Sequence, residues 1–521
     1  MPHAPNLVTL LNPVFNAAHD CGPLTDAICF EGTRVEVVES IKQWERDPSG
    51  RQIGWLTGPA GYGKSTIART VALQWDLDKI LAASYFFLRH SDDRSKGARL
   101  LPTLAFQLTL TIPETKQAIE EALVQDPTLL KRNLGYQFQK LLINPISALP
   151  QKDRRTMFIV IDALDECDDH DFISQLVKLI TKIDYSTFFI RFLFSSRRDG
   201  HVNRAFEHSP NSMTYHLSLS DVDANPDIKI FLKSRFDDIH TENPLVMANI
   251  PKPWPSPSDL DEIVEKVNRS FIFAATLVKY IGTGEVPPER LKSVVETHTG
   301  VDGTYVKIIK EFWDDEHFQT VFSTIMLLQR PFSVTELGTL LNLERSEILI
   351  EILKIQSVLI HPRDDDTPVD IVHTSLREFS ICPTRAGGLC VETPAHHLFI
   401  AERCLKVMLA NPRRVVFDKD PMKYAASYWY KHLRLTLNAD SCSLPYDSLV
   451  DSLEKFARQA ADTWSNTFIL NGHEGDFDES SIDDISHAVK VSPHLDHSTL
   501  SILLAEMPRP PLASHAGRSS S

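Results

Sequence analysis

The chain has 521 residues, of which 42% are hydrophobic and 24% charged, and its formal charge is -15 at pH 7. This length exceeds one hydrophobic core, so roughly two to four folded domains are expected, and the composition excludes a disordered or fibrous protein. The acidic balance argues against broad binding to nucleic acid or an anionic membrane, because both need a dominant basic face. We therefore expect no nucleic acid partner.

The cysteines and the apolar runs indicate the compartment. The seven cysteines are scattered and form no CxxC pair, so neither a zinc cage nor a disulfide framework is indicated. No basic leader precedes an apolar core near the N-terminus, and no run of about 18 apolar residues occurs. We expect a cytoplasmic protein without a membrane span.

The first predicted element is a helix within residues 31–47. Its apolar residues Val35, Val38, Ile41 and Trp44 have the spacing of one helical face. This helix should pack on the domain that follows it.

Short apolar runs then alternate with longer amphipathic stretches up to about Leu219. This alternation is typical of a parallel sheet with helices on both faces, the α/β class. The candidate strands are QIGWLTG (52–58), AASYFFL (82–88), MFIVIDAL (157–164), FFIRFLFSS (188–196) and MTYHLSL (213–219).

Helical periodicity dominates the rest of the chain. It is broken by a proline-rich surface loop at 244–260, and between 300 and 382 four helices precede two short strands, which suggests a winged helix. The end of the chain is too polar and proline-rich to bury a core.

The predicted division is a lead segment (1–28), a nucleotide domain (29–220), an all-helical domain (221–299), a winged helix (300–382), a C-terminal helical region (383–507) and a disordered tail (508–521).

The strongest chemical signal is GPAGYGKST, which fits G-x-x-x-x-G-K-[ST] between a predicted strand and a predicted helix. Its glycines let backbone N–H groups face phosphate oxygens, and the following helix adds its positive end. Lys64 would neutralise the β and γ phosphates, and the Ser65 hydroxyl would ligate Mg²⁺. The predicted phosphate-binding residues are Gly58, Pro59, Ala60, Gly61, Tyr62, Gly63, Lys64, Ser65 and Thr66.

A second signal is the acidic end of the strand MFIVID. Asp162 closes a buried apolar run, and buried strands end at the ligand edge of such sheets. Asp162 is therefore predicted to hold Mg²⁺, directly or through water, while Asp165 or Glu166 orients and deprotonates the attacking water. Arg197, at the end of another apolar strand, could reach a γ phosphate, although its neighbour Arg198 leaves that choice open.

Together, EGTR, GPAGYGKST, IDALDEC and the SSR strand end resemble the NACHT branch of the STAND signalling ATPases. More narrowly, they resemble the fungal NOD-like receptor group with a nephrocystin-3-like nucleotide domain. The resemblance continues through TLAFQLTLTIPE, FIFAATLVKYI, PFSVTELGTLL and VHTSLREF, so that it covers roughly residues 29 to 435.

The resemblance implies a switch between a closed ADP-bound and an open ATP-bound state, with slow hydrolysis. It also implies homo-oligomers in the ATP-bound state and a signalling protein partner. The implied biological role is fungal self/non-self recognition or innate immunity. It assigns Asp162 to magnesium, Arg197 to sensing phosphate, and His373 to a latch on the bound ADP phosphate. Gly32, Thr33 and Arg34 match a segment that touches the base or ribose.

The chain also departs from the family pattern. Relatives commonly have a glycine before the FIYAAT segment, where this chain has Arg269 and Ser270. The strand end reads SSRR instead of SRP. The first departure affects the helix that contacts the nucleotide in relatives. The second affects the geometry of the sensor arginine, Arg197.

Two alternatives to a switch remain open. One is a multiple-turnover P-loop ATPase or kinase, although no second substrate-binding constellation is visible. The other is a scaffold that binds nucleotide only for stability. Outside these motifs, His396, His397 and Trp429 are interpreted as ordinary helix and core residues.

Overall fold

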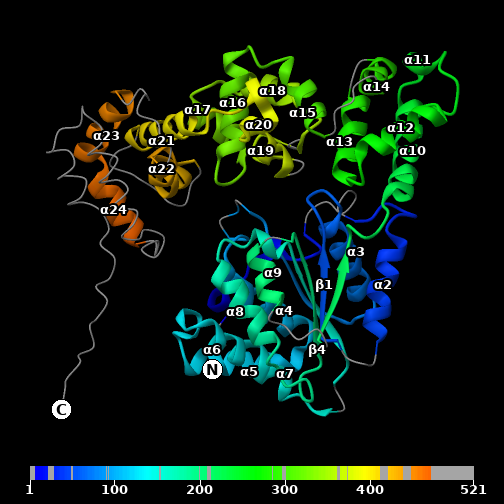
Figure 1. Cartoon of the computed structure of the whole chain (residues 1–521). Helices are drawn as coiled ribbons and strands as arrows, with labels where there is room; N and C mark the ends of the chain where they lie inside the picture. Colours follow the sequence, from blue (N-terminus) through cyan, green and yellow to red (C-terminus); the bar gives the residue numbers. More distant parts are fainter. Residues whose placement is uncertain are drawn as a thin grey trace. The chain divides into compact units, whose positions relative to one another are not determined.

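A computed structural model of the chain describes residues 6–21, 28–47, 51–89, 91, 93–151, 154–198, 200–207, 213–283, 286–295, 301–360, 364–371, 374–410, 421–437 and 447–470. The chain divides into two compact units, Met1–Thr304 and Tyr305–Ser521 (Figure 1). None of the helices in these described ranges combines the length and hydropathy of a membrane span.

The first unit is built on a five-stranded parallel sheet in the order β2-β3-β4-β1-β5. All five strands predicted from apolar runs are present, so the predicted sheet is confirmed. Because parallel strands end at the same edge, the loops after β1, β3 and β4 emerge close to one another. The strands are β1 (Ile53–Thr57), β2 (Leu81–Phe86), β3 (Met157–Asp162), β4 (Ile190–Ser196) and β5 (Thr214–Ser218).

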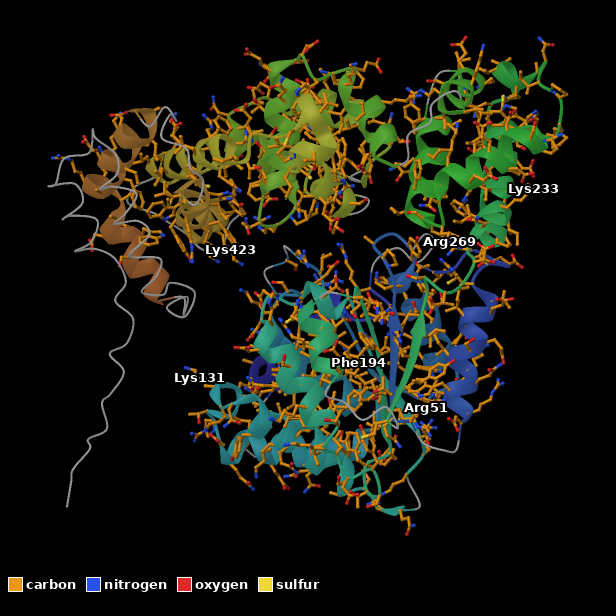
Figure 2. All side chains as sticks on the ribbon, in the orientation of Figure 1. Arg51, Lys131, Phe194, Lys233, Arg269 and Lys423 are labelled. Carbon is orange, nitrogen blue, oxygen red and sulfur yellow. The ribbon has the colours of Figure 1, made fainter. Side chains whose placement is uncertain are left out.

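Helices cover both faces of this sheet, as the alternating pattern predicted. Successive strand residues point to opposite faces, so Ile159 and Phe194, the latter labelled in Figure 2, join the core under α4, α8 and α9. Leu56 and Phe158 join the opposite core under α2 and α3. The covering helices are α2 (Val35–Arg46), α3 (Lys64–Leu77), α4 (Leu100–Thr111), α8 (His170–Ile180) and α9 (Gly200–Glu207).

Several shorter elements of the first unit were not predicted individually. They fill the N-terminal lead, the loops near the sheet edge and the long connection between β2 and β3. They are α1 (Leu7–Leu11), η1 (Phe15–Ala17), η2 (Gly97–Arg99), η3 (Pro113–Thr115), α5 (Lys116–Gln125), η4 (Leu129–Lys131), α6 (Leu134–Phe138), the π-helical turn η5 (Gln139–Ile143), α7 (Asn144–Ser147) and η7 (Leu164–Glu166).

A helical layer with its own core completes the first unit. The predicted change from strands to helices after Leu219 is confirmed. The proline-rich stretch at 244–260, predicted as a loop, begins with a short helix and ends in the first turn of a longer one. The helices are α10 (Asn225–Glu242), α11 (Pro244–Met247), α12 (Pro257–Val267), α13 (Phe271–Gly282) and α14 (Pro287–Val295).

The second unit is mainly helical, and α15 (Val301–Lys310) crosses the boundary into it. Its first part contains four further helices among the described residues and a small sheet of order β6-β8-β7, and β6 is a strand that the sequence did not indicate. The elements are α16 (Glu316–Leu327), β6 (Phe332–Ser333), α17 (Val334–Leu341), α18 (Arg345–Lys354), β7 (Leu359–Ile360), β8 (Pro368–Ile371) and α19 (Thr374–Ser380).

Further helices follow in the same unit. Trp429 and Trp464 are buried, with ring centroids 5.8 Å apart, which confirms Trp429 as a core residue. The elements are α20 (Pro383–Ala386), η8 (Gly387–Leu389), α21 (Thr393–Leu409), α22 (Met422–Leu437), α23 (Asp447–Gln459) and α24 (Ala461–Leu470).

Candidate functional site

The predicted phosphate loop lies between β1 and α3, at the carboxyl edge of the sheet. Gly61 and Gly63 have φ angles of 78° and 85°, a left-handed backbone that glycine adopts without strain. Gly63 is also the N-cap of the 14-residue helix α3. The loop therefore curls directly into the positive end of a helix, which is the arrangement that favours an anion.

Lys64 holds the two ends of this loop together. Its ammonium group donates to the carbonyl oxygens of Gly58 at 2.8 Å and Pro59 at 2.9 Å. Burial lowers the pKa of Lys64, and the nearby Asp165 carboxylate partly offsets this. The ammonium group thus lies over the loop, on the side of the sheet edge where the acidic residues also lie.

Asp162, the last residue of β3, is 2% exposed. Its Oδ1 accepts a hydrogen bond from Ser195 Oγ on β4. Burial raises the pKa of Asp162, while hydrogen bonds from Ser195 and Ser65 oppose that rise. The structure therefore brings together Ser65 and Asp162, the two residues predicted to hold the metal ion.

Asp165 and Arg197 form a pair. The backbone N–H of Arg197 donates to Asp165 Oδ1 at 2.9 Å, and Arg197 Nε lies 3.4 Å from Oδ2. Arg198 is exposed and contributes positive charge near His216 instead. Of the two arginines between which the sequence could not choose, Arg197 is the one that lies with the acidic residues.

Glu166 occupies a different environment from Asp165. Its Oε2 accepts from the backbone N–H of Arg89 at 2.9 Å. Burial raises the pKa of Glu166, the Arg89 hydrogen bond lowers it, and the carboxylates of Asp165 and Asp162 raise it further. A carboxyl group with a raised pKa is suited to proton transfer.

Two further cations near the carboxylates were not identified from the sequence. Arg69 on α3 donates to the carbonyl oxygens of His19 at 3.0 Å and Cys21 at 2.9 Å. Arg94 donates from Nε to the carbonyl oxygen of Phe86 at 2.9 Å. Burial lowers the pKa of both arginines, and the Asp162 carboxylate partly offsets this in each. The helical spacing of Arg69, four residues after Ser65, could have identified it.

Arg34, the residue just before α2, contacts the phosphate loop and the helical layer. The residue is 3% exposed, and its guanidinium donates to the carbonyl oxygen of Tyr62 at 2.7 Å. Its backbone N–H donates to Asp227 Oδ2 at 3.0 Å, and its guanidinium carbon lies 4.7 Å from the centre of the Phe271 ring. The start of α2, the loop and α13 therefore meet at one buried cation.

The N-terminal end of α13 contacts the phosphate loop directly. The backbone N–H of Ile272 donates to the carbonyl oxygen of Gly61 at 3.2 Å. Arg269, labelled in Figure 2, lies just before this helix and has a φ of 65°. Ser270 caps the helix by accepting a hydrogen bond from the backbone N–H of Phe273. The departure from the family pattern thus leaves α13 against the loop.

The donor set at Asp162 is suitable for magnesium. Mg²⁺ prefers oxygen ligands and is commonly bound by one or two protein groups together with phosphate oxygens and water. Ser65 and Asp162 supply a hydroxyl and a carboxylate, and the described residues contain no group of three or more His, Cys, Asp or Glu able to hold a metal ion. Phosphate oxygens and water would complete the coordination.

One predicted site residue cannot be placed. His373 lies outside the described residues.

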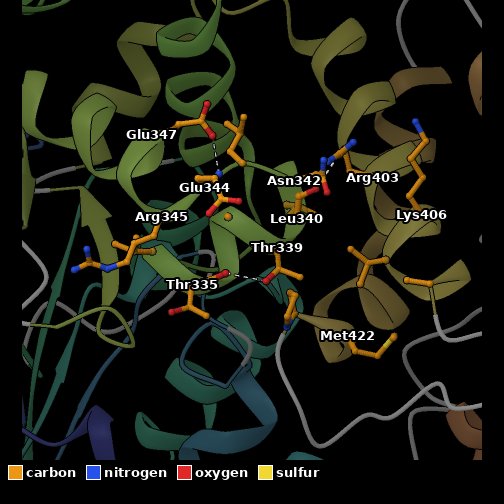
Figure 3. A pocket seen from close by; sticks show the side chains of 16 residues that line it. Thr335, Thr339, Leu340, Asn342, Glu344, Arg345, Glu347, Arg403, Lys406 and Met422 are labelled. Atoms are coloured by element: carbon orange, nitrogen blue, oxygen red, sulfur yellow. Dashed lines mark hydrogen bonds between the residues drawn. The ribbon is translucent and has the colours of Figure 1, made fainter.

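A cavity of about 990 Å³ in the second unit lies between α17, α18 and α21 (Figure 3). Its cationic side chains are already engaged: Arg345 pairs with Asp365, Lys406 with Glu402, and Arg403 with a backbone carbonyl of α17. These side chains therefore give the cavity no clear preference for an anion.

One known family matches part of the first unit. The family described as nephrocystin 3, N-terminal, matches residues 32–197, which include the phosphate loop, Asp162, Asp165, Glu166 and Arg197. No curated protein matches the chain.

Solved structures offer more distant similarities. A STAND protein with a tetratricopeptide repeat sensor from Pyrococcus horikoshii aligns with 92% of this chain and 61% of its own, at 13% identity and a TM-score of 0.43. Cdc6p from Pyrobaculum aerophilum aligns with 68% of this chain and 97% of its own, at 14% identity and a TM-score of 0.34. PCH-2 from C. elegans aligns with 54% of this chain and 72% of its own, at 12% identity and a TM-score of 0.33.

The chain thus spans less than two thirds of the Pyrococcus protein. The resemblance that the motifs indicated is confirmed over residues 32–197, which are similar to the nephrocystin 3 N-terminal family.

Proposed function

We propose that the first unit binds ATP or ADP with Mg²⁺ and that the chain works as a nucleotide-dependent signalling switch. The observation that carries this proposal is the meeting of Lys64, Ser65, Asp162, Asp165 and Arg197 at one edge of the sheet. They come from the start of α3, the end of β3, the turn η7 that follows it and the residue after β4. Parallel sheets place ligands at this edge.

Each of these residues has a defined task in binding. The loop from Gly58 to Gly63 and the N-terminus of α3 receive the phosphates, and Lys64 exchanges its bonds with loop carbonyls for bonds to phosphate oxygens. Ser65 and Asp162 hold the magnesium ion, which offsets phosphate charge when bound.

Hydrolysis depends on the two carboxylates that follow β3. We assign the role of general base to Glu166, because its raised pKa favours taking a proton from water. Asp165 positions Arg197. Arg197 then senses the γ phosphate. A slow nucleoside triphosphatase is expected, because a switch must remain in each state long enough to be read.

The contacts of α13 and Arg34 support the switch over the alternatives. Gly61 accepts from Ile272, and Tyr62 accepts from Arg34. These contacts would carry a change in the loop to the helical layer. The winged helix proposed for 300–382 is supported by α16, α17, α18 and the small sheet. A His373 latch, oligomerisation in the ATP-bound state, an unknown signalling partner and a role in self/non-self recognition remain parts of this proposal.

The proposal is tested by identifying the nucleotide that co-purifies with the chain and by measuring the affinity of Lys64→Ala for ADP. Retained ADP supports the switch, and Lys64→Ala should weaken ADP binding by about 10- to 100-fold, since it removes a charged phosphate contact worth about 1.5–3 kcal/mol. Lys178→Ala, on the exposed side of α8, is the control and should bind normally.

The alternatives give different results. Turnover well above about one per second would support a multiple-turnover enzyme. Signalling that survives in Lys64→Ala would support a scaffold.

A further inference from the structure

Asp162 is held by a serine of the SSR strand end to which the motifs assign no role. Ser195 lies on β4, the strand next to β3. Its hydroxyl donates to Oδ1 of Asp162, and both residues are almost completely buried, with 1% and 2% of their surface exposed. This bond therefore forms away from solvent, where an unpaired oxygen is costly.

The same hydroxyl has a second partner. Ser195 Oγ accepts from the backbone N–H of Ala163 at 3.1 Å. Ala163 has a φ of 54°, a left-handed conformation that alanine rarely adopts, and the chain turns there into η7 with Asp165 and Glu166. Ser195 thus bonds both to the end of β3 and to the turn that positions the next two carboxylates.

The neighbouring serine provides a comparison within the same strand. Ser196 also lies at the end of β4 and is fully buried, but its oxygen accepts from the indole N–H of Trp55 at 2.9 Å. Successive strand residues point to opposite faces of the sheet. Ser195 faces Asp162, and Ser196 faces the core.

We propose that Ser195 is a positioning residue for the magnesium site: its hydrogen bond to Oδ1 fixes the orientation of Asp162 and leaves the other carboxylate oxygen for the cation. The inference rests on the proposed function, because it assumes that Asp162 holds Mg²⁺. Side chains that hydrogen-bond to metal ligands typically contribute about 10- to 100-fold to metal affinity.

The test is a magnesium titration of ADP binding, with the full chain and a fluorescent ADP analogue. The variants are Ser195→Ala, Ser195→Val and Ser195→Thr. Val and Thr have nearly the same shape and are both well accepted in strands, so this pair differs mainly in the hydroxyl. Ser196→Ala is the control.

We expect Ser195→Ala and Ser195→Val to raise the magnesium concentration for half-maximal binding by about 10-fold or more. Ser195→Thr and Ser196→Ala should stay within about threefold of the wild type. Affinity for the analogue in EDTA should be the same in all variants that melt cooperatively, which separates a magnesium effect from damage to the loop.

The outcomes distinguish two failures. If the wild type binds the analogue equally well with and without magnesium, the proposed magnesium site is wrong and the inference fails with it. If the wild type depends on magnesium but Ser195→Val and Ser195→Thr behave alike, or Ser196→Ala loses as much as Ser195→Ala, only the role of Ser195 is overturned. Should Ser195→Ala not fold, the Val and Thr pair decides the question.

Discussion

Arg197 contacts Asp165 through both its backbone and its side chain, since its N–H donates to Oδ1 at 2.9 Å and its Nε lies 3.4 Å from Oδ2. The Asp165 side chain is 2% exposed and that of Arg197 is 21% exposed. The carboxylate is therefore removed from water and has the guanidinium beside it.

Replacing this arginine should destabilise the first unit. In Arg197→Ala, Asp165 keeps its backbone hydrogen bond and the nearby Lys64 charge but loses the guanidinium beside it. Removing one partner of a buried pair costs about 3–5 kcal/mol. Urea denaturation should show a loss toward the lower end of that range. Arg198→Ala is the matched control, because Arg198 is exposed, and it should change stability by less than about 0.5 kcal/mol. Equal losses in the two variants would contradict the pairing.

The two left-handed glycines of the phosphate loop should respond differently to alanine. A Cβ at Gly61 would lie 2.2 Å from Ile272 Cγ2 and 2.8 Å from Ser270 Oγ, whereas a Cβ at Gly63 would meet nothing within 4 Å. Both substitutions incur backbone strain of about 1–2 kcal/mol, and Gly61→Ala adds an overpacking cost of about 1–3 kcal/mol. Urea denaturation without nucleotide measures the difference. If Gly63→Ala is as destabilising as Gly61→Ala, α13 does not lie against the loop.

Arg269 offers a stabilising substitution. Its φ of 65° favours glycine, so Arg269→Gly relieves strain of about 1–2 kcal/mol but loses some of this gain to the greater freedom of unfolded glycine. A net gain of up to about 1 kcal/mol is expected in the free energy of unfolding. Arg269→Ala removes the same side chain without relieving the backbone and should show no gain. A gain of the same size in Arg269→Ala would contradict the explanation from backbone strain.

The second unit should lose stability on acidification because of its buried histidines. His397 Nδ1 lies 2.7 Å from His432 Nδ1, and Tyr424 hydroxyl lies 2.7 Å from His432 Nε2. Burial lowers the pKa of His397 to about 4 and that of His432 well below its usual value. Both residues are ordinary members of helices, as the sequence indicated for His397, but their protonation is suppressed.

The sign of the effect follows from the lowered pKa of His397. Between its unfolded pKa of about 6.5 and its folded pKa, the unfolded chain binds more protons, so stability falls as pH falls. His397 alone should contribute a loss of about 2 kcal/mol between pH 7 and pH 5. Urea denaturation of His397→Gln at both pH values should show a smaller loss than the wild type, while the exposed His317→Gln should match the wild type. An unchanged pH dependence in His397→Gln would contradict the prediction.

The sequence alone determined the parallel sheet, its five strands and the position of the phosphate loop. These features depend on local patterns: apolar runs form buried strands, and the loop needs glycines and a lysine at set spacing. Asp162 could be placed at the sheet edge for the same reason, because it ends an apolar run.

Only the tertiary structure decided which side chains meet there. The strand order puts β4 beside both β1 and β3, which brings Ser195 to Asp162 and Arg197 to Asp165 from more than 30 residues away. Likewise, Arg34 reaches Tyr62 and Phe271 through folding alone. Local sequence patterns do not predict such pairings. The hydrogen-bond partner of a buried serine or arginine is set by the packing of the sheet and helices, which brings residues distant in the sequence together.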